Sequence, residues 1–444
     1  MACSRVRWGM SSILAVLLVL AAWTASAEAK PKSAATPVPV IFVHGNSGSA
    51  QQFESNAMRF TSNGYPHDRL FVYEYDTSPG VSNDPAVTNL DGFIADVQAK
   101  TGAEQVDVLA HSRGTTVMHT FLETPARADQ VRRYVNFDGR TSATEPGGVT
   151  TLAIWGEGDQ SREIGGAENV YFPNKAHTEV TTSSAAFSHV YEFLNGEAPK
   201  TTEVVPEPPG QVTVAGRSAL FPSNEGYEGA VLRLFRVDAA TGARIGGPRY
   251  VKTLGADGSF GPVEVNGRKH YEFVVSKEGA STIHNYPEPF ERDDHFYRVL
   301  TAPLLAPFIE TGPDHTAIAV TRMREFWGDQ GTALNDRLEF DGNNVLTPAI
   351  APRARRVLAV FNFDAGSDGL TDTSAPLFPF SVLSFLTGVD NHLAASPDAS
   401  GTIAVRETMR EPDGQQVTTN VPNWPSSEHT VSVYFKDYAA KSFP

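Results

Sequence analysis

Short runs of β-branched and other apolar residues alternate with longer amphipathic stretches between about residues 37 and 196. This alternation predicts a mostly parallel sheet flanked by helices. Apolar residues recur at i, i+3, i+4 and i+7 in 90–97 and again in 187–194, so both stretches should form helices with one buried face. Gly196 should end the second helix. The predicted strands are residues 38–43, 70–75, 106–110, 134–137, 152–155 and 170–172.

The pattern changes after residue 211. Residues 198–211 combine several prolines with charged residues, a composition typical of a linker between domains. Beyond them, apolar and polar residues alternate in stretches such as 232–237 and 271–275, separated by turn-forming clusters. This period of two predicts an all-β, antiparallel region over 212–444, built as a barrel or a sandwich. A weaker seam near 303–307 is a candidate division of this region into two lobes.

The length and composition fit a globular protein of two or three domains, because 444 residues exceed what one hydrophobic core usually organises. Residues 1–27 have the order of a secretory signal: Arg5 and Arg7, an apolar run at 13–23, and the small residues 25–27. The expected divisions are therefore the signal at 1–27, an α/β part at 36–197, the linker at 198–211 and the β-rich region at 212–444. The mature chain should be secreted and begin near Glu28.

Charge and cysteine content narrow the chemistry. The net charge of −15 falls to −17 when Arg5 and Arg7 leave with the signal, which argues against binding to nucleic acid or to anionic membranes. Cys3 leaves with the same segment, so neither a disulfide nor thiolate chemistry is expected in the mature chain. No later stretch approaches the roughly 20 apolar residues of a transmembrane helix. The sequence leaves the oligomeric state open.

The strongest chemical signal lies at residues 106–115, where a predicted strand runs into Ala-His-Ser-Arg-Gly and then into the helical pattern of 117–122. A small-x-Ser-x-small sequence between a strand and a helix is typical of a nucleophile elbow. The tight turn exposes Ser112 as the nucleophile, while Ala110 and Gly114 leave room for the neighbouring strand and helix. His111 and Gly114 are expected to support the turn.

The loop after the first strand is the candidate oxyanion hole. Residues 41–49 leave that strand through His44-Gly45, and the next backbone N–H, that of Asn46, should point toward a substrate carbonyl. Together with the N–H of Arg113 it would stabilise negative charge on that oxygen. We expect His44 and Gly45 to support the loop. The alternative is a plain Gly-rich turn.

A serine hydroxyl needs a base, and His177 follows the last predicted strand and precedes the last helix of the α/β part. His119 and His189 fall inside predicted helices and are expected to be packed or solvated there. The acid that orients the base has two candidates, because Asp138 and Asp159 each follow a predicted strand. Position alone modestly favours Asp159, which occupies the commoner of the two places.

Several longer segments carry a resemblance to a known family. They are residues 53–66, 73–77, 110–114, 193–199, 289–294 and 431–438. These segments resemble the two-domain Archaeoglobus lipase and related bacterial α/β-hydrolase lipases, in which a C-terminal β-barrel follows the catalytic domain. The resemblance spans nearly the whole mature chain and implies that the acid is Asp138, at a strand end of the Leu-Asp-Gly type. It also implies that the barrel assists lipid binding. This chain departs from the family in the lid, for which it has only residues 77–89.

The sequence therefore predicts a secreted serine carboxylic ester hydrolase that acts on acylglycerols or similar esters through an acyl-enzyme and needs no cofactor. One alternative is an extracellular polyester depolymerase. Another is a lipid- or polymer-binding protein whose β region is the main functional element. A metal site is not expected: Asp364, Asp368 and Asp372 repeat every four residues, which is not the alternate spacing of a calcium-binding loop.

Overall fold

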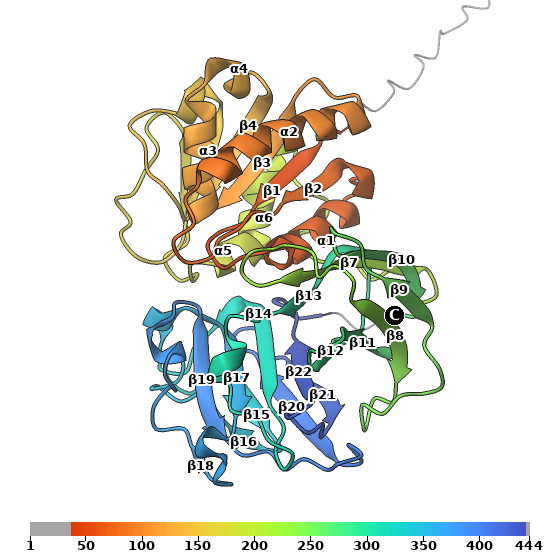
Figure 1. Cartoon of the computed structure of the whole chain (residues 1–444). Coiled ribbons are helices and arrows are strands. Elements are labelled where there is room, and N and C mark those ends of the chain that lie inside the picture. Colours follow the sequence, from red (N-terminus) through yellow and green to blue (C-terminus); the bar gives the residue numbers. More distant parts are fainter. Residues whose placement is uncertain (1–36, 441–444) are drawn as a thin grey trace, which may run out of the picture. The chain divides into compact units, whose positions relative to one another are not determined.

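A six-stranded parallel sheet forms the first part of the chain in the structure, a computed structural model that describes residues 37–440 (Figure 1). The strands lie in the order β2-β1-β3-β4-β5-β6, and every neighbouring pair is parallel. Because the chain moves from β1 to the edge strand β2 and then returns to β3, the sheet has its switch point between β1 and β3. The strands are β1 Val40–Val43, β2 Leu70–Tyr73, β3 Val106–His111, β4 Val131–Phe137, β5 Thr151–Trp155 and β6 Glu168–Tyr171.

Helices cover both faces of this sheet, which confirms the predicted fold class. The helices are α1 Glu54–Ser62, α2 Asp84–Thr101, α3 Arg113–Leu122, α4 Pro125–Ala128, α5 Glu179–Thr182 and α6 Ser184–Asn195. One core joins α1 and α6 to the sheet, and a second joins α2 and α3 to its other face. Gly196, with φ 75°, ends α6 as expected. The sequence pattern does not predict α1, because polar residues such as Asn56 and Arg59 are buried in it beside the apolar ones.

Strands dominate the second part of the chain, which confirms the expectation of a β-rich region. They form a three-stranded sheet (β10-β7-β13), a nine-stranded sheet (β18-β19-β17-β14-β22-β12-β11-β8-β9) and a four-stranded sheet (β16-β15-β20-β21). The strands are β7 Val212–Leu220, β8 Val231–Val237, β9 Tyr250–Thr253, β10 Ser259–Val265, β11 His270–Ser276, β12 Thr282–Pro287, β13 Asp294–Thr301, β14 Ile318–Phe326, β15 Arg337–Phe340, β16 Asn343–Asn344, β17 Val357–Phe363, β18 Thr371–Asp372, β19 Leu386–Asn391, β20 Thr402–Thr408, β21 Gln416–Pro422 and β22 His429–Tyr434.

The expectation of a purely antiparallel region is wrong. The strands that the sequence singled out, β8 and β11, do pair antiparallel, but β7 pairs parallel with β13, β17 with β19, and β22 with both β12 and β14. Parallel partners need long connections, so they are far apart in the sequence. A local alternation of apolar and polar residues identifies such strands and contains no information about their partners.

Residues 196–211 contain neither helix nor strand and run along α1. The backbone N–H of Thr201 donates to the Asn63 side chain (3.1 Å), and Arg59 donates to the carbonyl of Thr202 (2.9 Å). Residues 37–440 fall within one compact unit, so the domain limits at 36–197, 198–211 and 212–444 stay predictions. The predicted signal and Cys3 lie outside the described residues. No helix within 37–440 has the length and apolar character needed to cross a bilayer.

Candidate active site

Ser112 stands at the sharp turn between β3 and α3, at the carboxyl end of the sheet. Its backbone angles, φ 50° and ψ −118°, lie in a region that residues with side chains rarely adopt. A Cβ added to Gly114 would lie 2.6 Å from the carbonyl oxygen of His44, and one added to Gly45 would lie 2.8 Å from Nδ1 of His111. Both glycines are therefore required for the close approach of the elbow and the loop after β1.

Two backbone amides flank Ser112, those of Asn46 and Arg113. No hydrogen bond within residues 37–440 occupies either N–H, so both are available to an incoming oxygen. The Arg113 side chain connects the two segments, because it donates to Asn46 Oδ1 (3.1 Å) and to Asn83 Oδ1 (2.7 Å). The elbow and the predicted oxyanion loop are thus held together by the same residue that supplies one of the amides.

His44 is buried and supports the loop. Its Nδ1 donates to the carbonyl of Gly45 (2.8 Å), and its Nε2 accepts from the N–H of Tyr75 (3.2 Å). Burial lowers the pKa of His44 to about 4, so the ring is neutral at ordinary pH. With both nitrogens engaged and no charge, this histidine has no capacity left for proton transfer.

His177 and Asp138 form a buried pair. Nδ1 of His177 donates to Oδ2 of Asp138 (2.5 Å), while Oδ1 accepts from the N–H of Gly156 (2.8 Å) and lies 3.0 Å from the Arg162 guanidinium. Burial raises the pKa of Asp138, but the opposing interactions are stronger and lower the pKa overall. They are the hydrogen bond and charge of His177, the hydrogen bond from Gly156 and the charge of Arg162. The carboxylate therefore stays ionised and fixes the proton of His177 on Nδ1, which leaves Nε2 free to accept one.

Asp159, the other candidate acid, lies on an exposed loop after β5. Its carboxylate accepts from the backbone N–H and the hydroxyl of Ser161 (2.9 and 2.7 Å) and makes no contact with His177. The structure thus brings Asp138, and not Asp159, to the imidazole. His119 packs in α3 against Tyr134, and His189 lies in α6 beside Phe172, so neither approaches Ser112.

Gln52 and His111 form a support that the sequence did not reveal in full. Nε2 of His111 donates to the carbonyl of His177 (2.9 Å), and Nδ1 accepts from the Gln52 amide. The oxygen of the same Gln52 amide accepts from the N–H of Gly45 (3.1 Å). The predicted supporting role of His111 thus extends to the backbone of His177. Gln52 had no signal in the sequence, because a single glutamine in a short 3-10 helix, Ala50–Phe53, belongs to no distinctive pattern.

Ser112 and His177 line one cavity of about 420 Å³. No hydrogen bond joins the Ser112 hydroxyl to the His177 ring within the described chain, and such catalytic bonds often tighten only when substrate binds. Most of the cavity wall is apolar and comes from the β region, and none of residues 77–89 lines it. Among the wall residues are Ile283, Leu300, Met323, Phe361, Phe363 and Phe385. The β region therefore forms most of the wall around Ser112 and His177.

Asp364, one of the residues considered for a metal ion, is bonded to groups of its own neighbourhood. Asp364 accepts from Nδ1 of His392 (2.8 Å) and from the N–H groups of Asp368 and Gly369, so its carboxylate organises its own turn. Across residues 37–440, no three His, Cys, Asp or Glu side chains are grouped so that they would hold a metal ion.

The strand order, the serine at the turn after β3 and the histidine after the last strand define an α/β hydrolase. Comparison with protein families agrees. The family described as Lipase (class 2) matches residues 37–131, the Lipase C-terminal domain matches 210–303, and a family described as "-like, C-terminal domain" matches 305–439. These matches confirm the resemblance to two-domain lipases and support an ester hydrolase.

Solved structures with a similar fold include a gene product of Listeria innocua, with 14% identity over 37% of this chain and 97% of that one and a TM-score of 0.30. Lipase B of Aspergillus fumigatus has 14% identity over 37% of this chain and 54% of its own, with a TM-score of 0.30. A serine hydrolase without a lid from Xanthomonas campestris has 13% identity over 37% and 87%, with a TM-score of 0.27.

Proposed function

We propose that this protein is a secreted serine ester hydrolase that acts on lipid esters through an acyl-enzyme. Ser112 attacks the ester carbonyl while Nε2 of His177 takes its proton, and Asp138 holds the imidazole in the required tautomer. The N–H groups of Asn46 and Arg113 stabilise the oxyanion. His177 then returns the proton to the leaving alcohol. In the second half-reaction it deprotonates a water molecule that attacks the acyl-enzyme, and it passes this proton to the Ser112 oxygen as the bond to the acyl group breaks and the carboxylic acid leaves.

One observation carries this proposal: the strained serine and the carboxylate-paired imidazole open into the same apolar cavity. The pair of Asp138 and His177 is buried, so their interaction is not dissipated by water. A surface turn serine would need neither the positive φ of Ser112 nor the close approach that Gly45 and Gly114 permit. An apolar cavity is suited to the acyl chain of a lipid ester, with the carbonyl at the serine and the chain between strands of the β region.

The test uses the full chain and p-nitrophenyl esters of increasing acyl length. We expect hydrolysis, a preference for acyl chains longer than acetate, and loss of activity on the order of 10⁴-fold in Ser112→Ala. Ser78→Ala, a serine on the loop after β2, is the matched control and should retain activity. Undiminished turnover by Ser112→Ala would contradict the proposal. Cleavage of polyester film with no activity on lipid esters would instead favour a depolymerase. The N-terminal sequence of protein recovered from the culture medium tests export, with a start near Glu28 expected.

A further inference from the structure

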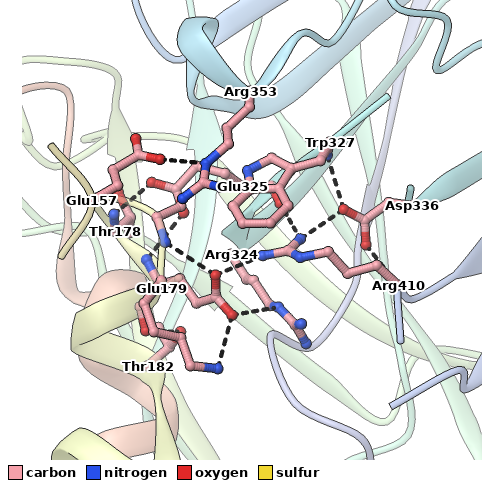
Figure 2. A network of polar contacts seen from close by, with 12 residues as sticks. Glu157, Thr178, Glu179, Thr182, Arg324, Glu325, Trp327, Asp336, Arg353 and Arg410 are labelled. Carbon is pink, nitrogen blue, oxygen red and sulfur yellow. Dashed lines mark hydrogen bonds and ion pairs between the residues drawn. The ribbon is translucent and has the colours of Figure 1, made fainter. Parts of the chain in front are cut away.

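A buried carboxylate from the β region binds the backbone directly after His177. Glu325, fully buried on β14, accepts hydrogen bonds from the N–H groups of Thr178 (2.5 Å) and Glu179 (3.0 Å) (Figure 2). These amides open α5 and have no carbonyl partner within their own helix. A residue nearly 150 positions away in the chain thus satisfies them.

The backbone before His177 also depends on the β region. The Glu179 carboxylate turns back to accept from the N–H of Ala176 (3.1 Å), and it is paired with Arg410 (2.6 Å) and Arg324 (3.2 Å). Burial raises the pKa of Glu179, but Arg410 and Arg324 outweigh it and lower the pKa to about 2. The Glu179 carboxylate is therefore ionised at every working pH. Arg324 on β14 and Arg410 after β20 hold this carboxylate, so the backbone both before and after His177 is bonded to groups that the β region positions.

Glu325 is itself held in place. Its backbone carbonyl accepts from Arg410 (2.7 Å) and from Arg322 (2.9 Å), and Arg410 also pairs with Asp336 (2.7 Å). Figure 2 shows Arg410 reaching toward Asp336 on one side and toward the Glu179 and Glu325 segment on the other. Because these groups are buried and mutually bonded, the backbone that carries the Glu325 side chain is held in place by its surroundings.

We propose that Glu325 is a positioning residue for His177: its carboxylate fixes the backbone that carries the imidazole, so the β region completes the geometry of the esterase site. The inference rests on the proposed function. Glu325 does not touch the reacting atoms and acts only through the Thr178 and Glu179 amides. Without it these buried donors lose their acceptor and the loop shifts, and a misplacement of roughly 1 Å lowers turnover by about 100-fold.

Glu325 also interacts electrostatically with the imidazole. Burial raises the pKa of Glu325 overall, and the hydrogen bond from Thr178 and the charge of His177 offset this rise only in part. The two hydrogen bonds to the backbone after His177 therefore carry the positioning role, and they come from a strand that no local motif connects with the catalytic part.

The experiment compares Glu325→Gln, Glu325→Asp and Glu407→Gln in the full chain. Glu407, on β20, is also fully buried, and it makes no contact with the His177 loop. It binds Arg322, which keeps its bond to Asp336 when Glu407 is changed, so Glu407→Gln controls for the loss of a buried carboxyl group. The measurements are kcat and KM for p-nitrophenyl butyrate and the melting temperature. We expect Glu325→Gln to lower kcat about 30- to 100-fold with KM changed less than about twofold. Glu325→Asp should recover part of the rate, and Glu407→Gln should stay within about twofold of the wild type.

Two results would overturn the inference: wild-type kcat in Glu325→Gln, or an equal loss of kcat in Glu407→Gln at an equal loss of stability. If Glu325→Gln is recovered unfolded, Glu325→Asp carries the test, because it keeps the charge and shortens the side chain; a wild-type kcat in the folded Asp variant would then overturn the inference. Ser112→Ala, measured in parallel, distinguishes a failure of the positioning role of Glu325 from a failure of the proposed function. An inactive Ser112→Ala with a fully active Glu325→Gln rejects the positioning role alone, whereas an active Ser112→Ala rejects the proposed function itself.

Discussion

The α/β part and the β region contribute to the same cavity in different ways. The α/β part supplies the groups that we propose for the chemistry, and three of them lie within a few residues of a strand end: Asn46 after β1, Ser112 after β3 and Asp138 after β4. The β region supplies most of the apolar wall and several buried charges that contact the first part, including Glu325 and Arg298. Reactive groups are thus set by short local sequences, whereas their surroundings are set by long-range packing.

The two kinds of contribution should also differ in their effect on stability. A strand, turn and helix that follow one another in the sequence position a side chain through their local backbone geometry. Contacts such as those of Glu74 with Arg298 and Arg217, or Glu325 with Thr178, exist only when both regions are folded against each other. We therefore expect substitutions in the α/β part to lower the chemical rate and substitutions at the shared contacts to lower stability as well.

The largest expected effect comes from Asp138→Asn. The amide cannot accept the Nδ1 proton as the carboxylate does, so the imidazole adopts the wrong tautomer and kcat should fall on the order of 10³- to 10⁴-fold with the fold intact. Asp159→Asn is the matched control. Because its carboxylate contacts only its own loop, kcat should stay within about twofold of the wild type. A comparable loss in Asp159→Asn, or none in Asp138→Asn, would reject the assignment of the acid.

The second effect is a loss of stability when the buried ion pair between Glu74 and Arg298 is broken. Both carboxylate oxygens of Glu74 bind Arg298 (2.8 Å each), and Oε1 also accepts from the N–H of Ala50 (2.8 Å). Glu74→Gln leaves the Arg298 guanidinium, which is 3% exposed, without a counter-charge, and we expect a loss of about 3 kcal/mol in the free energy of unfolding. Urea denaturation measures it.

The control for that experiment is Glu339→Gln. Its partner Arg337 is 54% exposed, so this pair is screened by water and its loss should cost less than about 1 kcal/mol. Equal destabilisation by the two substitutions would mean that the contact between the two regions contributes no more than an ordinary surface ion pair.

The sequence predicts one side of this comparison better than the other. All six strands of the parallel sheet, α3 and α6 are predicted within a few residues, whereas the periodicity at 90–97 marks only the middle of α2. Ser112 and His177 are found at the predicted turn and loop. Each depends on a local periodicity or a motif. The pairing of β22 with β12 and β14 joins residues more than 100 positions apart, and local periodicity does not encode such partners.

The cavity wall and the Glu325 contact could not be predicted for the same reason. A glutamate is ordinarily expected to face water, and only the packing of β14 against the loop after His177 buries Glu325. The choice between Asp138 and Asp159 was likewise open from position, because both follow a strand. It depends on which side chain reaches His177 in three dimensions.

The third effect is a dependence of stability on pH. Burial raises the pKa values of Glu74 and Glu179, but neighbouring arginines outweigh it and lower both values to about 2. These arginines are Arg298 and Arg217 beside Glu74, and Arg410 and Arg324 beside Glu179. Since the folded values lie below the unfolded value of about 4.5, each group stabilises the protein above pH 4.5, and this stability is lost as the pH falls toward 2. Each contributes at most about 3 kcal/mol.

Glu179→Gln should therefore be less stable than the wild type at pH 7 and approach it at low pH. Unfolding free energies from urea denaturation between pH 7 and pH 3 measure the difference. A constant difference across this range would show that the charge of Glu179 is not what stabilises the contact.

The smallest expected effect concerns two exposed apolar residues, Phe378 and Val382, which are 75% and 72% exposed. Both lie on the segment whose Phe380 stacks on Phe361, a residue of the cavity wall. The double change Phe378→Ser and Val382→Ser should lower the rate on emulsified lipid esters about tenfold, because less apolar area enters the lipid surface, and should leave the rate on soluble esters unchanged. Val251→Ser, at an exposed position on β9 that does not line the cavity, is the matched control. An equal loss on soluble and emulsified esters would mean that Phe378 and Val382 affect the shape of the cavity and do not contact the lipid surface. These two residues would then act like the rest of the β region, as part of the surroundings of the reactive groups.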